Sequence, residues 1–434
     1  MAITSIEAAV LDRVLARRQA LLEDLRRHVA LPTGAENRDA IEESADLLTQ
    51  RARALGAALA TVPGQPRPPW INAWRAGDPD AALRAPSHGW VPPVWVARRA
   101  GRAQPDAGAP APPPAVLIAG HLDTVHEPAG DFSRLCVAPD GRTATGPGCV
   151  DMKGGLVIAI HALEALQDAG AEARWTLMLN ADEETGSYHS DSALRAEALR
   201  THAGGAPVYH AALALEPAAA GGAIVTARGG SGAFMIEARG RAAHVGRDFA
   251  SGVSAVGALA GEIQRVHALS DPARGLCVNV SPLWCRAAPN VVADTARAWG
   301  NARYPTPEAG RSLLDRLGAT QTTPDALPAL SLTASFQRPA KPATAHTEAL
   351  LRLVAGVASD LGQPLPTAQT AGVCDGNNLQ DARATSDRPL AVLDTLGVRG
   401  GGLHTPQEWI ELPSLVERCQ LLALTIARLQ TATL

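Results

Sequence analysis

The spacing of apolar residues predicts helices at the start of the chain and buried strands further on. Leucines at helical spacing predict a helix over residues 4–31, and a second helix follows over residues 37–55. From Ala115, short apolar runs are typical of buried strands. The predicted elements of this region are strands over residues 115–119, 175–179 and 211–215 and a helix over residues 154–169. Strands that alternate with helices indicate a largely parallel sheet covered on both faces.

A different order of elements follows Arg228. The pattern predicts strands over residues 231–240, 276–286, 291–299 and 329–337 and helices over residues 253–269 and 308–319. This βαββαβ order is that of a ferredoxin-like unit. The alternating texture then resumes, with a helix over residues 345–361, a strand over 390–396 and a helix over 412–429.

The predicted fold class is therefore α/β, with a mixed, largely parallel sheet flanked by helices and an inserted ferredoxin-like α+β domain. We expect residues 1–228 and 341–434 to form the larger domain and residues 229–340 to form the inserted one.

Residues 63–114 differ from the rest of the chain because they are rich in proline. They contain Trp70, Trp74, Trp90 and Trp95, which are four of the eight tryptophans. Within this region, residues 100–114 consist mostly of Ala, Gly, Pro and polar residues, which is typical of a surface loop. The tryptophans could line the entrance to a binding site or pack against the sheet, and packing is the usual role of such residues.

The composition is that of a globular protein, with 46% hydrophobic and 19% charged residues among 434. A net charge of -4 offers no electrostatic footprint for nucleic acid or for an anionic membrane surface. We see no secretory signal and no apolar run long enough to span a membrane. The six cysteines are scattered and form no CxxC pair, as expected of reduced thiols in a cytoplasmic protein.

Five short segments concentrate histidine and acidic residues where predicted strands end or helices begin. Each alone has a structural explanation, such as a helix cap or a solvated acidic loop. Together they supply two histidines and three carboxylates without a thiolate, a ligand set suited to two zinc ions. The segments are residues 120–124 (His121, Asp123), 146–155 (Asp151), 180–187 (Glu183, Glu184), 213–217 (Glu216) and 400–405 (His404).

In this order and at these spacings, the five segments resemble the family of di-zinc aminoacylases, acetylornithine deacetylases, succinyl-diaminopimelate desuccinylases and glutamate carboxypeptidases. The resemblance covers about residues 115–425. Within the family, the segments at residues 182–187, 216–217 and 231–232 are most similar to the folate-cleaving glutamate carboxypeptidases of bacteria.

The resemblance implies a role for each ligand. His121 and Glu216 bind one zinc ion, Glu184 and His404 bind the other, and Asp151 bridges the two. It also implies a cis peptide bond after Asp151. Cobalt or manganese could replace zinc.

The resemblance extends to catalytic residues. Asp123 is expected to orient His121, and Glu183 is expected to act as the general base. In the inserted domain, His244 matches a lid histidine that holds the oxyanion, and Asn290 matches a lid asparagine.

Two arginines of the inserted domain are expected to bind substrate. Arg338 matches an arginine that binds a substrate carboxylate. Arg303 matches an arginine of the family, but Asn301 stands where the family usually has aspartate, and this departure leaves the support of Arg303 in question. Arg399 is a second candidate for binding an acidic substrate side chain.

The resulting hypothesis is a metal-dependent amidohydrolase that cleaves an amide bond next to a free carboxylate. The first interpretation is a carboxypeptidase that releases a C-terminal amino acid such as glutamate, and the alternative is an N-acyl amino acid deacylase. A catalytically silent binding relative and a thiol hydrolase using Cys374 are further alternatives. We also expect a homodimer formed through the lid, in which His244 reaches the partner's active site.

Overall fold

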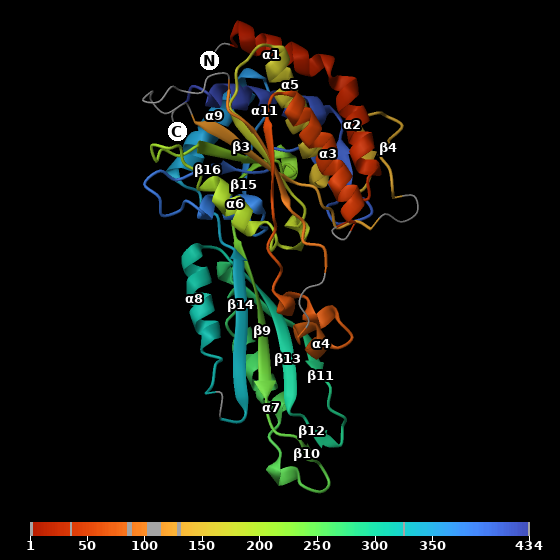
Figure 1. The fold of residues 1–434 in the computed structure, drawn as a ribbon, viewed down its shortest axis with the longest axis vertical. Coiled ribbons are helices and arrows are strands. Elements are labelled where there is room, and N and C mark those ends of the chain that lie inside the picture. The colour runs from red at the N-terminus through yellow and green to blue at the C-terminus, as the bar shows by residue number, and fades with distance from the viewer. Residues whose placement is uncertain are drawn as a thin grey trace.

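The chain folds around two sheets that follow one another along the long axis of the molecule (Figure 1). The computed structural model describes residues 3–34, 37–84, 89–101, 114–127, 132–323 and 326–432. The predicted loop at residues 100–114 lies mostly outside the described residues.

The first sheet has six strands in the order β1-β2-β6-β3-β7-β16. Neighbouring pairs among β6, β3, β7 and β16 are parallel, whereas β1 and β2 form an antiparallel edge. The largely parallel sheet predicted from the sequence is thus confirmed. Its strands are β1 (Ala58–Val62), β2 (Val94–Arg99), β3 (Ala115–His121), β6 (Trp175–Asn180), β7 (Tyr209–Ala214) and β16 (Ala391–Leu393).

Helices cover both faces of this sheet because its strands are apolar on both sides. Val116 and Ile118 of β3 pack into one core, and Leu117 and Ala119 pack into another. The first core is completed by α1 (Ser5–Ala16), α2 (Arg18–Ala30), α3 (Arg38–Ala54), α5 (Gly154–Asp168), α9 (Ala345–Asp360) and α11 (Pro413–Leu429). The second is completed by α6 (Asp191–Ala198) and α10 (Asp375–Asp381).

The first predicted helix is divided in two. The prediction of one helix over residues 4–31 was wrong, since α1 and α2 meet at Arg17, whose ψ of 3° departs from helical geometry. The side chain of Arg17 pairs with Glu164 and Asp168 of α5. Apolar spacing continues across the break, so the sequence pattern does not reveal it.

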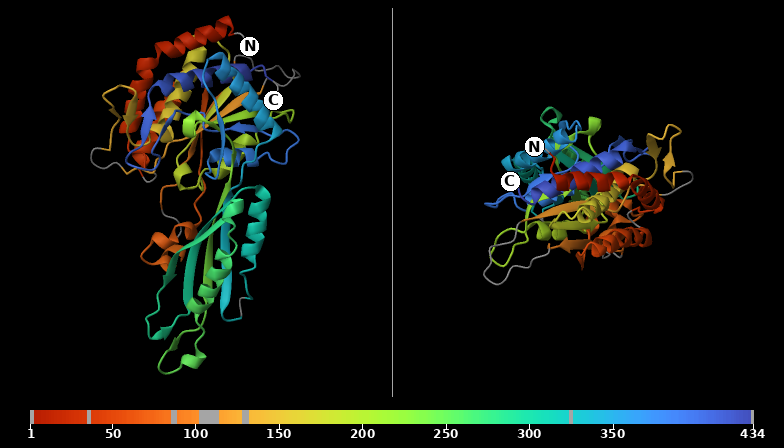
Figure 2. Two further views of the ribbon diagram at one scale, coloured as in Figure 1. Left: turned by 180° about the vertical axis from the view of Figure 1, so that it is seen from behind. Right: turned by 90° about the horizontal axis from the view of Figure 1, so that it is seen from above.

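The second sheet contains four long strands in the order β11-β13-β9-β14. We call residues 230–338 the lid. They comprise β9 (Gly230–Arg239), α7 (Ala255–His267), β11 (Cys277–Cys285), β13 (Thr295–Tyr304), α8 (Pro307–Gly318) and β14 (Ala329–Arg338). This is the predicted βαββαβ order, and all four strands lie within the segment expected to be inserted. Figure 1 and the left view of Figure 2 show the lid extending away from the first sheet.

One lid strand begins later than predicted. Instead of residues 291–299, the long strand is β13, and the short β12 (Val291–Val292) precedes it. β12 pairs with β10 (Ala243–His244) at the end of the lid farthest from the first sheet (Figure 1).

The remaining elements are short and lie close to the first sheet or the lid. They are α4 (Pro79–Arg84), the parallel pair β8 (Ile224–Arg228) and β15 (Thr367–Thr370), and a sheet of β4 (Cys136–Val137), β5 (Thr143–Thr145), β18 (Trp409–Glu411) and β17 (Gly400–Gly401). Among the described residues, no helix has both the length and the apolar character that crossing a membrane requires.

The two chain segments that connect the lid to the first sheet are fixed by a buried ion cluster. Arg228 and Lys341 exchange backbone hydrogen bonds of 2.8 and 2.9 Å. Both side chains pair with the buried Asp394, at 2.8 and 3.3 Å. Because Asp394 directly follows β16, the cluster holds the base of the lid against the sheet edge where the parallel strands end.

Candidate metal centre

Neighbouring parallel strands bring the expected metal ligands to one edge of the first sheet. β3 ends at His121, while Glu184 and Glu216 follow the ends of β6 and β7 within a few residues. Because β6, β3 and β7 are adjacent and parallel, their carboxyl ends meet at this edge.

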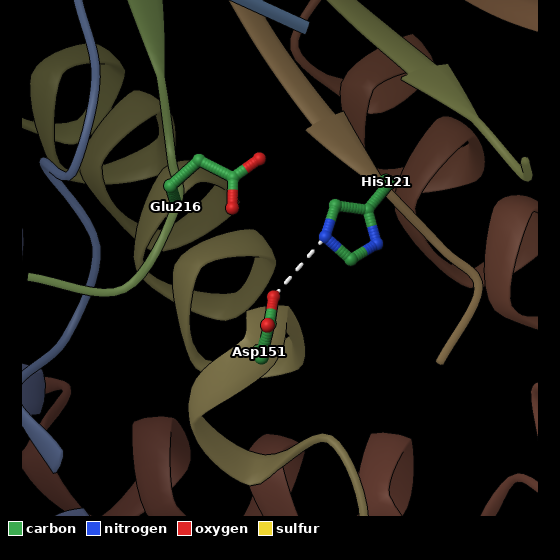
Figure 3. Close-up of side chains that lie close together, drawn as sticks. All are labelled: His121, Asp151 and Glu216. Atoms are coloured by element: carbon green, nitrogen blue, oxygen red, sulfur yellow. Dashed lines mark hydrogen bonds and ion pairs between the residues drawn. The ribbon is translucent and has the colours of Figure 1, made fainter. Parts of the chain in front are cut away.

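The five expected ligands form two groups that share Asp151. One group contains His121, Asp151 and Glu216, and the other contains Asp151, Glu184 and His404. In each group, one ligand atom from every residue lies within 4.8 Å of the others. Figure 3 shows His121 and Glu216 converging on the carboxylate of Asp151 in the first group.

Both histidines point a ring nitrogen at Asp151. The Nε2 atom of His121 lies 3.2 Å from one carboxylate oxygen of Asp151, and the Nε2 atom of His404 lies 3.4 Å from the other. His404 Nε2 also lies 3.2 Å from Glu184. Although burial opposes ionisation, the hydrogen bonds with the two histidines hold the pKa of Asp151 well below its usual range.

The other two carboxylates have the opposite shift. Burial and the charge of Asp151 together raise the pKa of Glu216 to about 8. Burial and the same charge also raise the pKa of Glu184. Hydrogen bonds to Asp151 and Glu184 raise the pKa of His404 to about 10. Without metal, Glu216 therefore holds a proton near neutral pH, as expected where a cation would otherwise balance the crowded acids.

The residues present fit a pair of divalent cations. Imidazole nitrogens and carboxylate oxygens are ordinary ligands of zinc, and each group offers three. In addition, Glu184 Oε1 is buried and has no hydrogen-bond partner among the described residues. A buried carboxylate oxygen without a donor is costly unless a cation is bound to it.

Asp123 contacts the residues of the candidate metal centre and holds them in position. The Nδ1 atom of His121 lies 2.9 Å from the backbone carbonyl of Asp123 and 3.5 Å from its carboxylate. The carboxylate accepts hydrogen bonds from the backbone N–H groups of Glu183 and Glu184, at 3.2 and 3.0 Å. Asp123 thus fixes the histidine mainly through its carbonyl, and its carboxylate positions the two glutamates.

Glu183 lies beside the metal ligands, in contact with the lid. Its carboxylate accepts a hydrogen bond of 2.7 Å from Arg338 at the end of β14. Arg338 is buried and also donates to Asp375 at 2.8 Å and to Ser187 at 2.7 Å. Burial raises the pKa of Glu183 well above its usual value, although the charge of Arg338 opposes this shift.

Arg303 has fewer partners than Arg338. Both line a cavity of about 530 Å³ beside the metal centre, together with Glu183, Glu184 and His404. Arg303 Nη1 is buried and has no hydrogen-bond partner among the described residues. Burial, together with the nearby charge of Arg338, lowers the pKa of Arg303.

Three other candidate residues lie away from the centre. Arg399 pairs with Glu411 and Glu417, both at 2.6 Å, and is not among the described residues that line the cavity. His244 and Asn290 come together at the far end of the lid, where Val245 N donates to the Asn290 carbonyl at 3.0 Å. Both side chains are exposed.

Cys374 is poorly suited to nucleophilic attack. The side chain is buried, and burial raises the pKa of its thiol well above the usual value. A buried neutral thiol argues against the thiol-hydrolase alternative.

Comparison with known proteins agrees with this geometry. A model described as "Peptidase family M20/M25/M40" matches residues 117–428. That range covers more than half of the chain and includes all five expected ligands. The chain belongs to peptidase family M20/M25/M40. Membership makes it a hydrolase of a metal-dependent peptidase family and confirms the resemblance drawn from the sequence.

Individual known proteins are similar over most of the chain. Carboxypeptidase G2 of Pseudomonas sp. (strain RS-16) is 26% identical over 316 residues, which are 71% of this chain and 72% of the relative. A tripeptidase from Staphylococcus aureus has a TM-score of 0.67 at 19% identity, covering 96% of this chain and 99% of its own. YXEP of Bacillus subtilis, described as a dinuclear metal-binding peptidase of the M20 family, has a TM-score of 0.62 at 15% identity, covering 96% and 99%. The two structures show that the fold is shared.

The Asp151 segment of this M20 chain has an unusual backbone. The peptide bond between Asp151 and Met152 is cis, as the resemblance implied. The segment follows Gly148, whose φ of 68° lies in the left-handed region. A side chain at this position would meet Thr124 at 2.5 Å, so glycine is required on both counts.

Glu408 is a supporting residue that the sequence analysis missed. Its buried carboxylate accepts backbone hydrogen bonds from Gly148, Val150 and Asp151, at 2.9, 2.8 and 3.0 Å. His126 lies 2.6 Å away. Because Glu408 is four residues after His404, its hydrogen bonds connect the loop of His404 to the segment of Asp151, the residue that both ligand groups share. An isolated acid before a short strand gives no signal of this role.

Replacing Glu408 should weaken metal binding without removing a ligand. Glu408→Ala leaves three buried N–H groups unpaired, and such supporting residues typically change metal affinity by about 10- to 100-fold. Competition with a chromogenic chelator would measure the change. The matched control is Glu411→Gln on β18, which contacts Arg399 and should leave affinity unchanged. Wild-type affinity in Glu408→Ala would refute this role.

The stability of the metal-free protein should depend on pH more strongly than that of the metal-loaded protein. The folded-state pKa values of Glu216 and His404, about 8 and about 10, exceed their ordinary values of 4.5 and 6.5. The stabilisation that these bound protons provide is complete below the ordinary pKa values. It is lost as the pH rises through the raised pKa values of the folded state. The melting temperature of metal-free protein should therefore fall between pH 4.5, where Glu216 begins to lose this contribution, and about pH 10, where His404 has lost it.

Bound metal should reduce this fall, since the same groups then act as ligands without their protons. Calorimetry of both forms across this range would measure the difference. A metal-free His404→Asn variant should lose the alkaline part of the fall. Parallel pH profiles for the two forms of the wild-type protein would contradict the prediction.

Proposed function

We propose that this chain is a dinuclear zinc amidohydrolase that cleaves an amide bond next to a free carboxylate and releases a C-terminal amino acid such as glutamate. The observation that carries the proposal is the pair of ligand groups sharing Asp151, with Glu183 beside them and Arg303 in the adjoining cavity. Carboxypeptidase G2, the similar protein from Pseudomonas, supports the carboxypeptidase interpretation by its name.

The proposed chemistry divides between the metals and Glu183. Zinc ions held by the two groups would supply Lewis-acid polarisation of the substrate carbonyl and a water whose pKa lies near neutrality. Glu183 takes a proton from the attacking water and returns it to the leaving amine. Arg338 holds the Glu183 carboxylate toward the lid, and the charge of Arg338 favours its ionised form. Asp123 fixes the backbone of Glu183 so that the base keeps its place.

The substrate carboxylate is proposed to bind at Arg303. Arg338 already contacts two buried carboxylates, whereas Arg303 has a buried nitrogen without a partner and faces the same cavity. Asn301, two residues earlier on β13, is neutral and offers Arg303 no carboxylate. A guanidinium can bind a carboxylate through two parallel hydrogen bonds, which favours this role.

The proposed assembly is a homodimer through the lid. His244 ends β10 and Asn290 directly precedes β12, and these two strands lie at the end of the lid farthest from the first sheet (Figure 1). Nearby apolar side chains are exposed, with Phe249 at 65% and Leu283 at 62%. A second chain could cover them and receive His244 at its metal centre. The unpaired cysteines, of which Cys136, Cys277 and Cys285 are exposed, favour the reducing cytoplasm.

Glu183→Gln should abolish turnover while metal content stays normal. The amide keeps an acceptor for Arg338 but cannot take a proton, and loss of a general base typically costs about 10²- to 10⁴-fold in rate. The assay is free amine released from glutamate-terminated dipeptides and N-acetyl amino acids, with elemental analysis of each protein. Wild-type protein should hold two metal ions and lose activity to a chelator.

The matched variant Glu184→Ala should instead lose metal. If the two results are exchanged, the roles of the two glutamates are exchanged too. Fully active wild-type protein with less than one metal ion per chain would overturn the proposed function. Release from N-acetyl amino acids but not from dipeptides would identify a deacylase.

Arg303→Ala should reduce kcat/KM for substrates with a free α-carboxylate much more than for the corresponding amides. The expected selective loss is about 100-fold, the size of a charge-assisted contact of 2–3 kcal/mol. Arg338→Ala should impair carboxylate and amide substrates alike, since it removes the partner of Glu183. If only Arg338→Ala lowers kcat/KM more for carboxylate substrates than for amides, Arg338 rather than Arg303 binds the substrate carboxylate.

Subunits that each lack a different catalytic group should restore one another. His244→Ala and Glu183→Gln proteins should each be inactive, and mixing them should generate heterodimers with one complete site. Random exchange should recover about one quarter of wild-type activity. The control is a mixture of each variant with itself. Exchange demonstrated by mass spectrometry without recovery would exclude shared sites.

A further inference from the structure

Residues 63–93 connect the edge strands β1 and β2 and lie outside the range matched by the family model. We call this segment the insert, and its described parts are residues 63–84 and 89–93. It contains three of the four tryptophans noted in the sequence analysis. Their positions show that they have different environments.

The middle of the insert is attached to the lid. Trp299 of β13 donates from its indole nitrogen to the Trp70 carbonyl at 2.8 Å. Trp70, Ala82 and Leu83 pack against a small cluster that includes Met235 and Trp299. These lid residues lie on the sheet face opposite the one that packs against α7 and α8, because alternate residues of β9 belong to the main lid core.

Ion pairs reinforce this attachment. Asp80 of α4 pairs with the buried Arg297, which also pairs with Glu237 at 2.6 Å. Asp78 lies 3.3 Å from Arg286. Figure 1 shows α4 beside β11 and β13 of the lid.

The start of the insert is attached to the loop that carries the metal ligands. Gln65 N donates to the His189 carbonyl at 2.9 Å, and His189 Nδ1 lies 2.6 Å from the Gln65 carbonyl. Arg67 donates to the hydroxyl of Thr185, the residue after Glu184, at 3.1 Å. The insert therefore spans from the metal-binding loop to the lid.

A cavity of about 730 Å³ lies beneath this span. Arg67, Pro68, Trp90 and Pro92 line it from the insert, and Val125 lines it from the loop after β3. It also reaches the metal ligand Glu184.

The second cavity, which holds Arg303, borders the same Glu184, and Arg67 and Asn72 line both. The two cavities thus flank one metal ligand. A substrate whose carboxylate lies in the Arg303 cavity would extend its other end into the cavity beneath the insert.

We propose that the insert forms the acyl-side pocket of the substrate site and selects a bulky aromatic acyl group, with Trp90 as a specificity-determining residue. This inference rests on the proposed function. The volume is far larger than an acetyl group needs and lies within the roughly 300–1,000 Å³ of ordinary ligand pockets. Indole and proline rings offer flat apolar surfaces, and the guanidinium of Arg67 can stack on an aromatic ring.

Only Trp90 of the insert tryptophans lines this cavity. Trp70 packs on the lid, and Trp74 is 40% exposed beside Arg75. Trp95 belongs to β2 and does not line the cavity, although it packs against the main core as Trp90 also does. The chain therefore offers Trp74→Ala as a control from the same segment.

The test compares N-benzoyl and N-acetyl derivatives of the same amino acid. Wild-type protein should prefer the benzoyl substrate by about 10-fold or more in kcat/KM. Trp90→Ala should lower kcat/KM about 10-fold for the benzoyl substrate and leave the acetyl substrate within about 2-fold. Trp74→Ala should leave the ratio unchanged. Val125→Phe fills the cavity without removing Trp90 and should produce the same selective loss.

Binding to the Glu183→Gln variant separates this inference from the proposed function. Calorimetry should show tighter binding of the benzoyl compound than of the acetyl compound, and the difference should disappear when Trp90→Ala is added. If binding shows this pattern but neither substrate is hydrolysed by metal-loaded wild-type protein, the proposed function is wrong. The assignment of the pocket to an aromatic group is then still supported. Equal binding of the two compounds, or equal effects of Trp90→Ala and Trp74→Ala, would overturn the pocket.

Discussion

The crowding of carboxylates around Asp151 is the constraint on which the rest of this site depends. Asp151 is buried and belongs to both ligand groups, and each group adds another acid that is partly buried. Burial makes the mutual repulsion of these charges costly, so the surrounding structure must hold them in place. Glu408 fixes the backbone on one side of Asp151, and Asp123 fixes the loop of Glu184 on the other. Both supports are themselves acids, and both accept backbone N–H groups, so the histidines and bound cations are left to balance the charge.

Ion pairs between opposite charges also connect the lid to the candidate metal centre. Arg338 lies at the end of the last lid strand. It contacts Glu183, which follows β6 of the first sheet, and Asp375, which begins α10. The buried cluster of Arg228, Lys341 and Asp394 fixes the adjacent chain connections. Two separate groups of ion pairs therefore position Glu183 and the chain connections of the lid. Arg303 lies on β13, which β9 separates from β14, and its Nη1 atom has no hydrogen-bond partner among the described residues.

The sequence predicts the parts of this molecule that follow from local pattern. The parallel strands were found because each is apolar on both faces, and their order brings the acids that follow them to one edge. Contacts between residues distant in sequence could not be predicted. Glu408 meets the Asp151 segment across more than 250 residues, and its own neighbourhood carries no distinguishing pattern. The partners of Arg338 come from two segments distant from it in sequence, so its burial was unexpected. The strands β1 and β2 were missed because proline-rich sequence separates them.

The position of the insert has a consequence for how such an enzyme could change during evolution. It joins two antiparallel strands at the margin of the sheet, where lengthening a connection disturbs none of the parallel strands that carry the ligands. Its anchors on the lid are few and lie on a sheet face away from the lid's own core. The insert could therefore be replaced as a unit among related proteins. Such a replacement would change the range of substrates while the residues at the ends of the parallel strands stay the same.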